Sequence, residues 1–161
     1  MIQGLSIRES VGGNDIDRIV ALRYEILRKP HDLSLADAAF SNDSSSDTVH
    51  FLAVSDEKLV GCSTLIFNPE TGEAQLRGMA VAHEYQNQGI GRLMLSAAHA
   101  RARNAGASLW CNARFSAIGF YERNGWVRKG ELFEMPVIGL HSVMIWCGNT
   151  GGAETQPIRT C

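Results

Sequence analysis

The stretch Met79-Ala80-Val81-Ala82-His83-Glu84-Tyr85-Gln86-Asn87-Gln88-Gly89-Ile90-Gly91-Arg92-Leu93-Met94-Leu95 decides the fold of this chain. An apolar strand runs into a polar turn, then two glycines one residue apart, then the start of an amphipathic helix. The first backbone N–H groups of such a helix have no partners within it, and the helix dipole adds partial positive charge there. The two glycines either leave the backbone open to a phosphate or supply a positive φ. The stretch therefore predicts a binding site for the phosphates of a nucleotide-like ligand.

Two common phosphate-binding loops do not fit this turn. A Walker loop needs a Lys after its last glycine, and no Lys follows Gly89 or Gly91. A dinucleotide fingerprint needs a third glycine, and Met94 stands at that position. The turn instead reads Gln86-x-x-Gly89-x-Gly91, an Arg/Gln-x-x-Gly-x-Gly/Ala pattern. Taken alone, this pattern is also compatible with a glycine-rich corner between a strand and a helix that binds no ligand.

A second segment follows at a distance of one helix. Residues 108–113 form a short buried-type strand, and residues 116–126 read Ser-Ala-Ile-Gly-Phe-Tyr-Glu-Arg-Asn-Gly-Trp. In this order the two segments resemble the GNAT superfamily of N-acetyltransferases, whose corresponding helix reads Ala-x-x-Phe-Tyr-Glu-Lys-x-Gly-Phe. Here Trp126 replaces the last Phe. The resemblance implies a mixed α/β (α+β) fold: one domain with a mostly antiparallel, twisted central sheet, splayed at the cofactor site and covered by helices on both faces.

The composition agrees with a single globular domain. The chain has 161 residues, of which 45% are hydrophobic and 20% charged. A formal net charge of −2 without a basic stripe argues against a nucleic-acid partner. Neither a membrane span nor a signal-peptide core is legible, so we expect a cytoplasmic protein. The four cysteines have no metal-ligand spacing, and we expect no metal.

The order of elements is predicted from periodicity and turn residues. Asn14 is expected to cap a helix that Pro30 ends, and a helix from Gly89 to about Asn104 is expected to stop before Gly106. Strands are expected at 5–8, 49–54, 59–67, 74–82, 108–113, 127–129 and 141–147, and a short helix at 33–39. The acetyltransferase-like domain is placed at 1–148, and the polar, glycine-rich segment 149–161 is expected to be a flexible tail.

The resemblance implies where acetyl-CoA would bind. The strand of Met79, Ala80 and Val81 and the strand of Asn112 are expected to part, so that the pantetheine arm enters between them like an extra strand. The Val81 N–H is a candidate to polarise the thioester carbonyl. Asn112 either meets the arm or simply satisfies a strand end. The pyrophosphate is expected at the loop formed by Gln86, Asn87, Gln88, Gly89, Ile90, Gly91 and Arg92.

Tyr121 is the catalytic candidate. It stands at the position of the family's general-acid tyrosine. A phenol with a pKa of ~10 can protonate a departing thiolate whose thiol has a pKa of ~8.5, provided that the two are hydrogen-bonded. The alternative is that Tyr121 and Phe120 only pack the helix on the sheet. We also expect Tyr121 to contact the cofactor.

The general base and the acceptor site are less defined in the sequence. Some family members carry a Glu where this chain has Gln75. Deprotonation through ordered water, without a single base, stays open. Family members shape their amine pocket with the N-terminal helices and the segment before the last strand. By that resemblance the candidates for acceptor binding are Arg23, Tyr24, Arg28 and His141, although a solvated helix face or a buried histidine would also account for them.

The sequence thus predicts an N-acetyltransferase that uses acetyl-CoA as acyl donor and transfers the acetyl group directly to an amine. The expected partners are acetyl-CoA and a small-molecule amine, since no acidic groove for a lysine-rich peptide is legible. Neither a nucleic acid nor a membrane is expected, and a homodimer is left open. The alternative is a non-catalytic acyl-CoA-binding module of the same fold, motivated by Gln75.

Overall fold

The structure is a computed structural model, and it describes residues 2–148. The expected tail at 149–161 lies outside the described residues. Within residues 2–148, no helix is long and apolar enough to cross a membrane.

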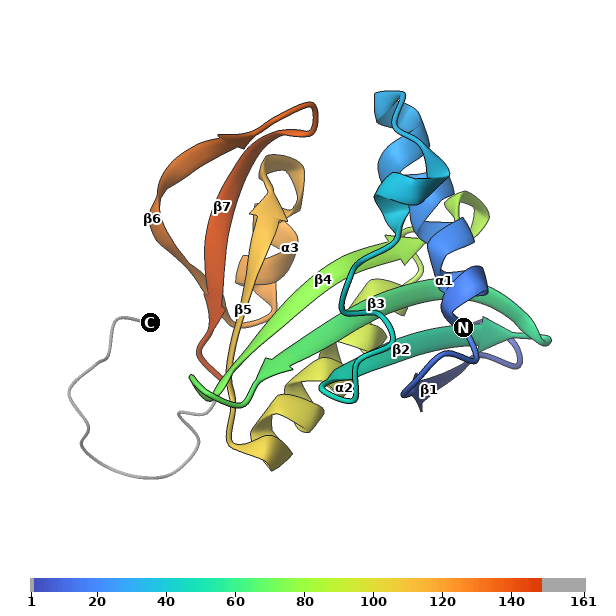
Figure 1. Cartoon of the computed structure of the whole chain (residues 1–161), viewed down its shortest axis with the longest axis horizontal. Helices are drawn as coiled ribbons and strands as arrows, with labels where there is room; N and C mark the ends of the chain where they lie inside the picture. Colours follow the sequence, from blue (N-terminus) through green and yellow to red (C-terminus); the bar gives the residue numbers. More distant parts are fainter. Residues whose placement is uncertain (1, 149–161) are drawn as a thin grey trace.

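A seven-stranded sheet forms the centre of the molecule, in the order β1-β2-β3-β4-β5-β7-β6 (Figure 1). Only the β4–β5 pair is parallel, and all other neighbours are antiparallel. The mostly antiparallel sheet of the predicted mixed α/β fold is therefore confirmed. The strands are β1 (Ser6–Ser10), β2 (Thr48–Ser55), β3 (Lys58–Asn68), β4 (Glu73–Val81), β5 (Ser108–Arg114), β6 (Trp126–Met135) and β7 (Gly139–Trp146).

Helices cover both faces of the sheet, as predicted. Adjacent residues of β2 point to opposite faces. Leu52 packs in a cluster with Ile19 of α1 (Ile16–Arg23). Phe51 packs in the main core with Leu95 of α2 (Ile90–Ala105) and Ile118 of α3 (Ile118–Arg123). The site described below lies where β4 and β5 separate.

The helix that follows the glycine turn begins and ends where the sequence indicates. Gly89 precedes α2 with φ +87°, and Gly106 follows it with φ +64°, both in the left-handed region that favours glycine. The N-terminal helix differs from the prediction, because Asp15 rather than Asn14 occupies its N-cap position. The Asp15 carboxylate accepts hydrogen bonds from Ser10 and Arg18 rather than from the helix backbone.

The region around Pro30 also differs from the prediction. After α1 the chain continues as one π-helical segment, η1 (Tyr24–Arg28), and one 3₁₀ turn, η2 (Lys29–His31), which contains Pro30. A further 3₁₀ turn, η3 (Leu35–Ala38), replaces the short helix expected there. These irregular turns bring η1 alongside β4, and η3 packs against η1 and α1.

The edge strand β6 is longer than predicted. It runs from Trp126 to Met135, whereas the sequence indicated only residues 127–129. Its residues from Arg128 to Glu131 are all exposed, so they do not show the alternation of a half-buried strand. A register shift between Lys129 and Phe133 interrupts its pairing with β7.

Candidate active site

The site begins where β4 and β5 part. Their parallel pairing runs from Glu73–Ser108 to Leu76–Cys111 and stops there. Beyond these positions β4 still pairs with β3 and β5 still pairs with β7, so each strand keeps one edge that faces the gap. Unpaired strand edges of this kind can receive an extended, peptide-like ligand.

A β-bulge in β4 lies at the mouth of the gap. Thr64 pairs with Arg77 and Cys62 pairs with Ala80, so two β4 residues, Gly78 and Met79, stand opposite one residue of β3. Gly78 has φ +63°, and a Cβ there would lie 2.8 Å from Phe40 Cε2. Only glycine fits this position without displacing a neighbour.

The predicted phosphate loop is braced by its own side chains. Gln86 donates from Nε2 to the Val81 carbonyl at 2.9 Å, and Gln88 donates from Nε2 to the Glu84 carbonyl at 3.0 Å. Between them Asn87 has φ +59°. These bonds hold the turn in the shape that delivers the chain into α2, whose first N–H groups have no partners within the helix.

An outer groove runs along this loop. Two sets of residues line it, one from β4 and the loop and the other from the segment around α3. The first set comprises Met79, Val81, Tyr85, Gln86, Asn87, Gly89, Ile90, Gly91 and Arg92. The second comprises Arg114, Ser116, Ala117, Phe120, Arg123 and Asn124, and Ile26 and Leu27 complete the lining.

Eight of the residues predicted for the cofactor line the outer groove, namely Met79, Val81, Gln86, Asn87, Gly89, Ile90, Gly91 and Arg92. Four others lie elsewhere. Ala80 is buried against the α1 layer, and the Gln88 side chain bonds within the loop. Asn112 and Tyr121 line a second cavity described next.

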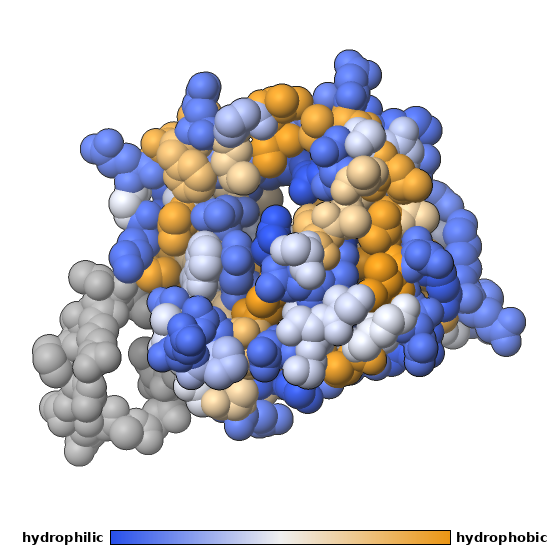
Figure 2. All heavy atoms as spheres, viewed as in Figure 1, coloured by the Kyte–Doolittle hydropathy of each residue, from blue (hydrophilic) through white to orange (hydrophobic). Residues whose placement is uncertain are grey.

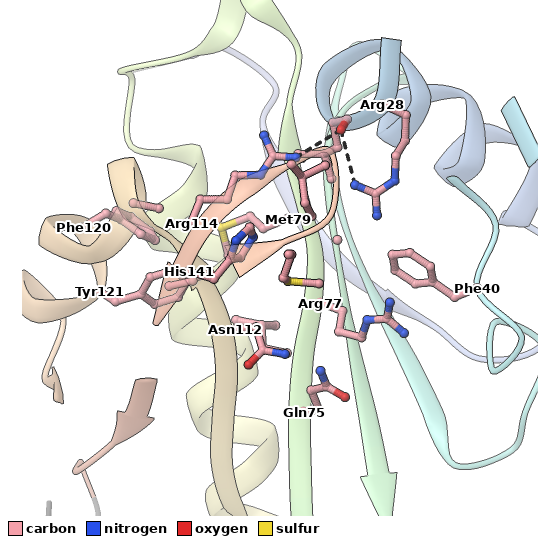
Figure 3. A pocket seen from close by; sticks show the side chains of 17 residues that line it. Arg28, Phe40, Gln75, Arg77, Met79, Asn112, Arg114, Phe120, Tyr121 and His141 are labelled. Carbon is pink, nitrogen blue, oxygen red and sulfur yellow. Dashed lines mark hydrogen bonds between the residues drawn. The ribbon is translucent and has the colours of Figure 1, made fainter. Parts of the chain in front are cut away.

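The second, inner cavity adjoins the groove. The two share Leu27, Met79, Arg114, Ala117 and Phe120 in their linings. Figure 3 shows Phe120, Tyr121, His141 and Arg114 on one side and Gln75 and Arg77 of β4 on the other, with Met79 between them and Arg28 and Phe40 beyond. In the space-filling view the molecule is hollowed between its β5–β7 side and its α1 side, and both hydrophilic and hydrophobic side chains border the hollow (Figure 2). The rest of the lining is Leu76, Gly78, Asn112, Ala113, Met135 and Ile138.

Tyr121 lies at the inner wall of this cavity and is 8% exposed. Its ring makes edge contacts with Phe120 and Trp126, with centroids 5.2 and 5.1 Å away. Burial, together with the negative charge of a Cys111 thiolate and the hydrogen bond that the phenol donates to the Cys111 sulfur, raises the pKa of Tyr121 well above its usual value. The hydroxyl therefore keeps its proton across the physiological pH range.

His141 also lines the inner cavity and is 3% exposed. Its Nδ1 lies 2.8 Å from the Gly139 carbonyl oxygen. Because a carbonyl only accepts, Nδ1 carries the proton and Nε2 of the neutral ring is an acceptor. Gln75 lines the same cavity, and its amide cannot take up a proton.

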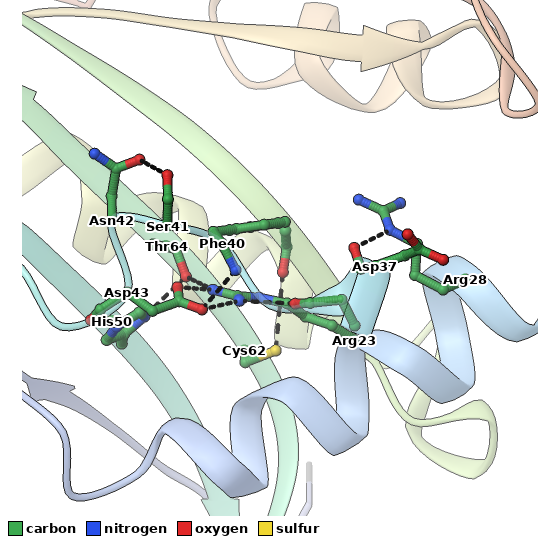
Figure 4. A network of polar contacts seen from close by, with 12 residues as sticks. Arg23, Arg28, Asp37, Phe40, Ser41, Asn42, Asp43, His50, Cys62 and Thr64 are labelled. Carbon is green, nitrogen blue, oxygen red and sulfur yellow. Dashed lines mark hydrogen bonds and ion pairs between the residues drawn. The ribbon is translucent and has the colours of Figure 1, made fainter. Parts of the chain in front are cut away.

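The other two acceptor candidates do not reach either cavity. Tyr24 lies in η1, outside both linings. Arg23 is fully buried and forms a bidentate ion pair with Asp43, with both N···O distances 2.9 Å (Figure 4). Burial would raise the pKa of Asp43, but the hydrogen bonds from Arg23 and from the Phe40 N–H lower it overall.

The buried arginine supports the site from behind. Its guanidinium also donates to the Ala38 carbonyl and to Thr64 Oγ1, and it lies 3.9 Å from the centroid of the Phe40 ring. Thr64 in turn bonds with His50, whose Nε2 reaches the Asp43 carbonyl at 2.9 Å. This network ties η3 and its following loop to β2 and β3, beside the bulge at Gly78.

Comparison with known proteins identifies the family. The acetyltransferase (GNAT) domain matches residues 46–128 of the chain. The uncharacterized N-acetyltransferase YitI of Bacillus subtilis (strain 168) is 33% identical over 131 residues, which cover 76% of this chain and 85% of YitI. The chain belongs to the GNAT acetyltransferase family. The predicted family is thereby confirmed.

Solved structures share the fold over most of the chain. The crystal structure of Escherichia coli ElaA superposes with a TM-score of 0.78 at 15% identity, covering 88% of this chain and 99% of ElaA. A GNAT family acetyltransferase from Elizabethkingia anophelis, solved with acetyl-CoA bound, gives a TM-score of 0.62 at 18% identity and covers 89% of this chain and 98% of its own. At these low sequence identities the structural similarity establishes a shared fold and nothing more.

Several lining residues were not singled out from the sequence. Arg77, Arg114 and Phe40 belong to the inner cavity, and Arg123 to the outer groove. A signal for Arg77 exists, because the glycine that follows it lies inside a predicted strand and indicates a bulge. No comparable signal marks Phe40, which reaches the cavity from a polar loop.

Proposed function

We propose that the protein is an acetyl-CoA-dependent N-acetyltransferase that transfers the acetyl group directly to a small-molecule amine. The observation that carries this proposal is the meeting of the outer groove and the inner cavity at Met79 and Phe120. The groove offers the glycine turn and the α2 N-terminus for a pyrophosphate. The cavity offers room for an acceptor beside the same stretch of β4.

Each proposed step uses a named group of the chain. The free edge of β4 after the bulge would hold the thioester, with the Val81 N–H toward its carbonyl oxygen. The amine nitrogen forms a bond to the thioester carbon, and the carbon–sulfur bond breaks. Tyr121 donates its proton to the departing thiolate, and His141 Nε2 accepts the proton that the amine releases. The products are the acetylated amine and CoA as its thiol.

The binding and catalytic parts of this proposal are tested on separate readouts. Titration with acetyl-CoA measures cofactor binding, and thiol release over a panel of amines measures transfer. Tyr121→Phe should lower the single-turnover rate by about 10²-fold and leave acetyl-CoA affinity unchanged, since Phe preserves the volume of the ring. Tyr24→Phe is the matched control, because Tyr24 lines neither cavity.

A non-catalytic acyl-CoA-binding module is the second candidate, favoured by Gln75 in place of a carboxylate in the cavity. Tight binding of acetyl-CoA without thiol release for any amine would support that module. Equal single-turnover rates for the parent and Tyr121→Phe would leave Tyr121 as a packing residue.

A further inference from the structure

Three arginines converge on the inner cavity without a carboxylate to neutralise them. Arg28, Arg77 and Arg114 all line it, and its lining contains neither Asp nor Glu. None of the ion pairs found within residues 2–148 includes these three side chains. Guanidinium groups remain charged in proteins, so the cavity has a strongly positive wall.

Arg77 is held in place but its donors are unused. Its guanidinium carbon lies 4.0 Å from the centroid of the Phe40 ring, which the buried Arg23 contacts as well. In the part of the chain that the structure describes, no hydrogen bond involves the Arg77 side chain. The aromatic contact orders the guanidinium plane, while all five N–H donors stay available to a ligand.

The other two guanidinium groups are fixed at one carbonyl. Arg28 and Arg114 both donate to the Leu27 carbonyl oxygen, at 3.3 and 3.0 Å (Figure 3). Arg28 also donates from Nε to the Asp37 carbonyl at 3.0 Å. Burial and then repulsion from neighbouring arginines lower the pKa of Arg28, Arg77 and Arg114. Asp37 and Asp43 offset this repulsion only in part for Arg28 and Arg77, so each arginine lies among like charges that a bound anion would stabilise.

The phosphates of CoA do not account for this cluster. Arg28 and Arg77 line only the inner cavity, whereas the glycine turn and the α2 N-terminus line the outer groove. Arg114 lines both spaces, but an anion bound at Arg28 and Arg77 would belong to the other substrate. Arg77 and Met79 lie two residues apart on β4, so an anionic group at Arg77 and an amine beside Met79 would be close enough to belong to one compact molecule.

We propose that the acceptor is a small amine that carries a carboxylate, an amino-acid-like molecule whose carboxylate binds Arg77 with support from Arg28 and Arg114. A carboxylate matches the planar donor fork of a guanidinium in a two-point contact. This inference rests on the proposed N-acetyltransferase function. It also gives the cavity its selectivity, because cationic acceptors such as polyamines would meet the same positive wall.

Kinetics with matched amines test the inference. Thiol release from acetyl-CoA is measured with amino acids and ω-amino acids, with their carboxamides, with aminoalkylphosphonates and with polyamines. We expect kcat/KM for the carboxylates to exceed that of the carboxamides by about 10- to 100-fold, the worth of a charge-assisted hydrogen bond. Arg77→Gln should raise KM for the carboxylate by a similar factor and leave acetyl-CoA affinity unchanged.

Controls separate the outcomes. Arg101→Gln alters an exposed arginine outside both cavities and should change neither constant. Arg28→Gln provides a second probe if Arg77→Gln does not fold. Equal use of carboxylates and carboxamides, or preference for polyamines or phosphonates, overturns the inference while the acetyltransferase function stands. Binding of acetyl-CoA without acetylation of any amine overturns the proposed function, and the inference with it.

Discussion

Replacement of Gly78 by Ala should destabilise the protein through two separate terms. The first is conformational, because Gly78 has φ +63° and an L residue in that region costs roughly 1–2 kcal/mol. The second is steric, because the added Cβ would lie 2.8 Å from Phe40 Cε2 and 2.9 Å from Arg23 Nε. Both distances are shorter than real Cβ contacts, so a neighbour must move.

The neighbours of Gly78 cannot move freely. Arg23 is fully buried, bonds to Asp43, Ala38 and Thr64, and contacts the Phe40 ring. Overpacking at such a site typically costs about 1–3 kcal/mol. Together the two terms predict a loss of about 2–5 kcal/mol in the free energy of unfolding. For a chain of this length the melting temperature should fall by roughly 4–20 °C.

A matched control isolates the steric term. Gly130 has φ +75°, and nothing lies within 4 Å of a Cβ added there, so Gly130→Ala should lose only the conformational part. Urea unfolding of both variants gives the difference, which we expect to be about 1–3 kcal/mol larger for Gly78→Ala. Equal losses for the two variants would refute the account of a bulge held against Phe40 and Arg23. Gly78→Ala should also lower transfer activity, because Met79 follows Gly78 directly in the bulge.

Two further predictions concern the cofactor groove and pH. Gly91→Val should weaken CoA binding by about 10-fold or more with the fold intact. A Cβ at position 91 would lie 3.5 Å from Phe120 Cζ, so a larger side chain would fill the groove. Unchanged CoA affinity in a titration would place the pyrophosphate elsewhere. His99 stacks on Trp146 and accepts a hydrogen bond from Trp126, and burial, with repulsion from a neighbouring arginine, lowers its pKa from 6.5 to about 4. Its neutral form therefore contributes stability that is fully present above pH 6.5 and lost as the pH falls toward 4. The contribution is about 1–2 kcal/mol after discounting for the partly exposed ring; identical stability–pH slopes for the parent and His99→Gln would contradict it.

The sequence by itself determined the elements whose signals are local. The glycines at 89 and 106 bound α2 because each takes a left-handed conformation at a helix end, a property of one residue and its neighbours. The strands β2 to β5 and the glycine turn could be predicted for the same reason, and with them the family and eight residues of the outer groove. For Gly91 the sequence left two roles open, a positive φ or access to the backbone. The structure gives Gly89 but not Gly91 a positive φ, so backbone access stays the prediction for Gly91.

Only the tertiary structure decided what each arginine does. Arg23, Arg28, Arg77 and Arg114 look alike in sequence, where their charges suit a solvated surface. In the fold, Asp43 comes from a loop 20 residues away and pairs with Arg23, whereas no carboxylate of the described residues pairs with the other three. The β4 bulge, the π-helical segment η1 and the parting of β4 from β5 set this arrangement, and all depend on contacts between segments far apart in the chain. Local periodicity carries no information about such long-range pairing, so the charge of the inner cavity followed from the fold alone.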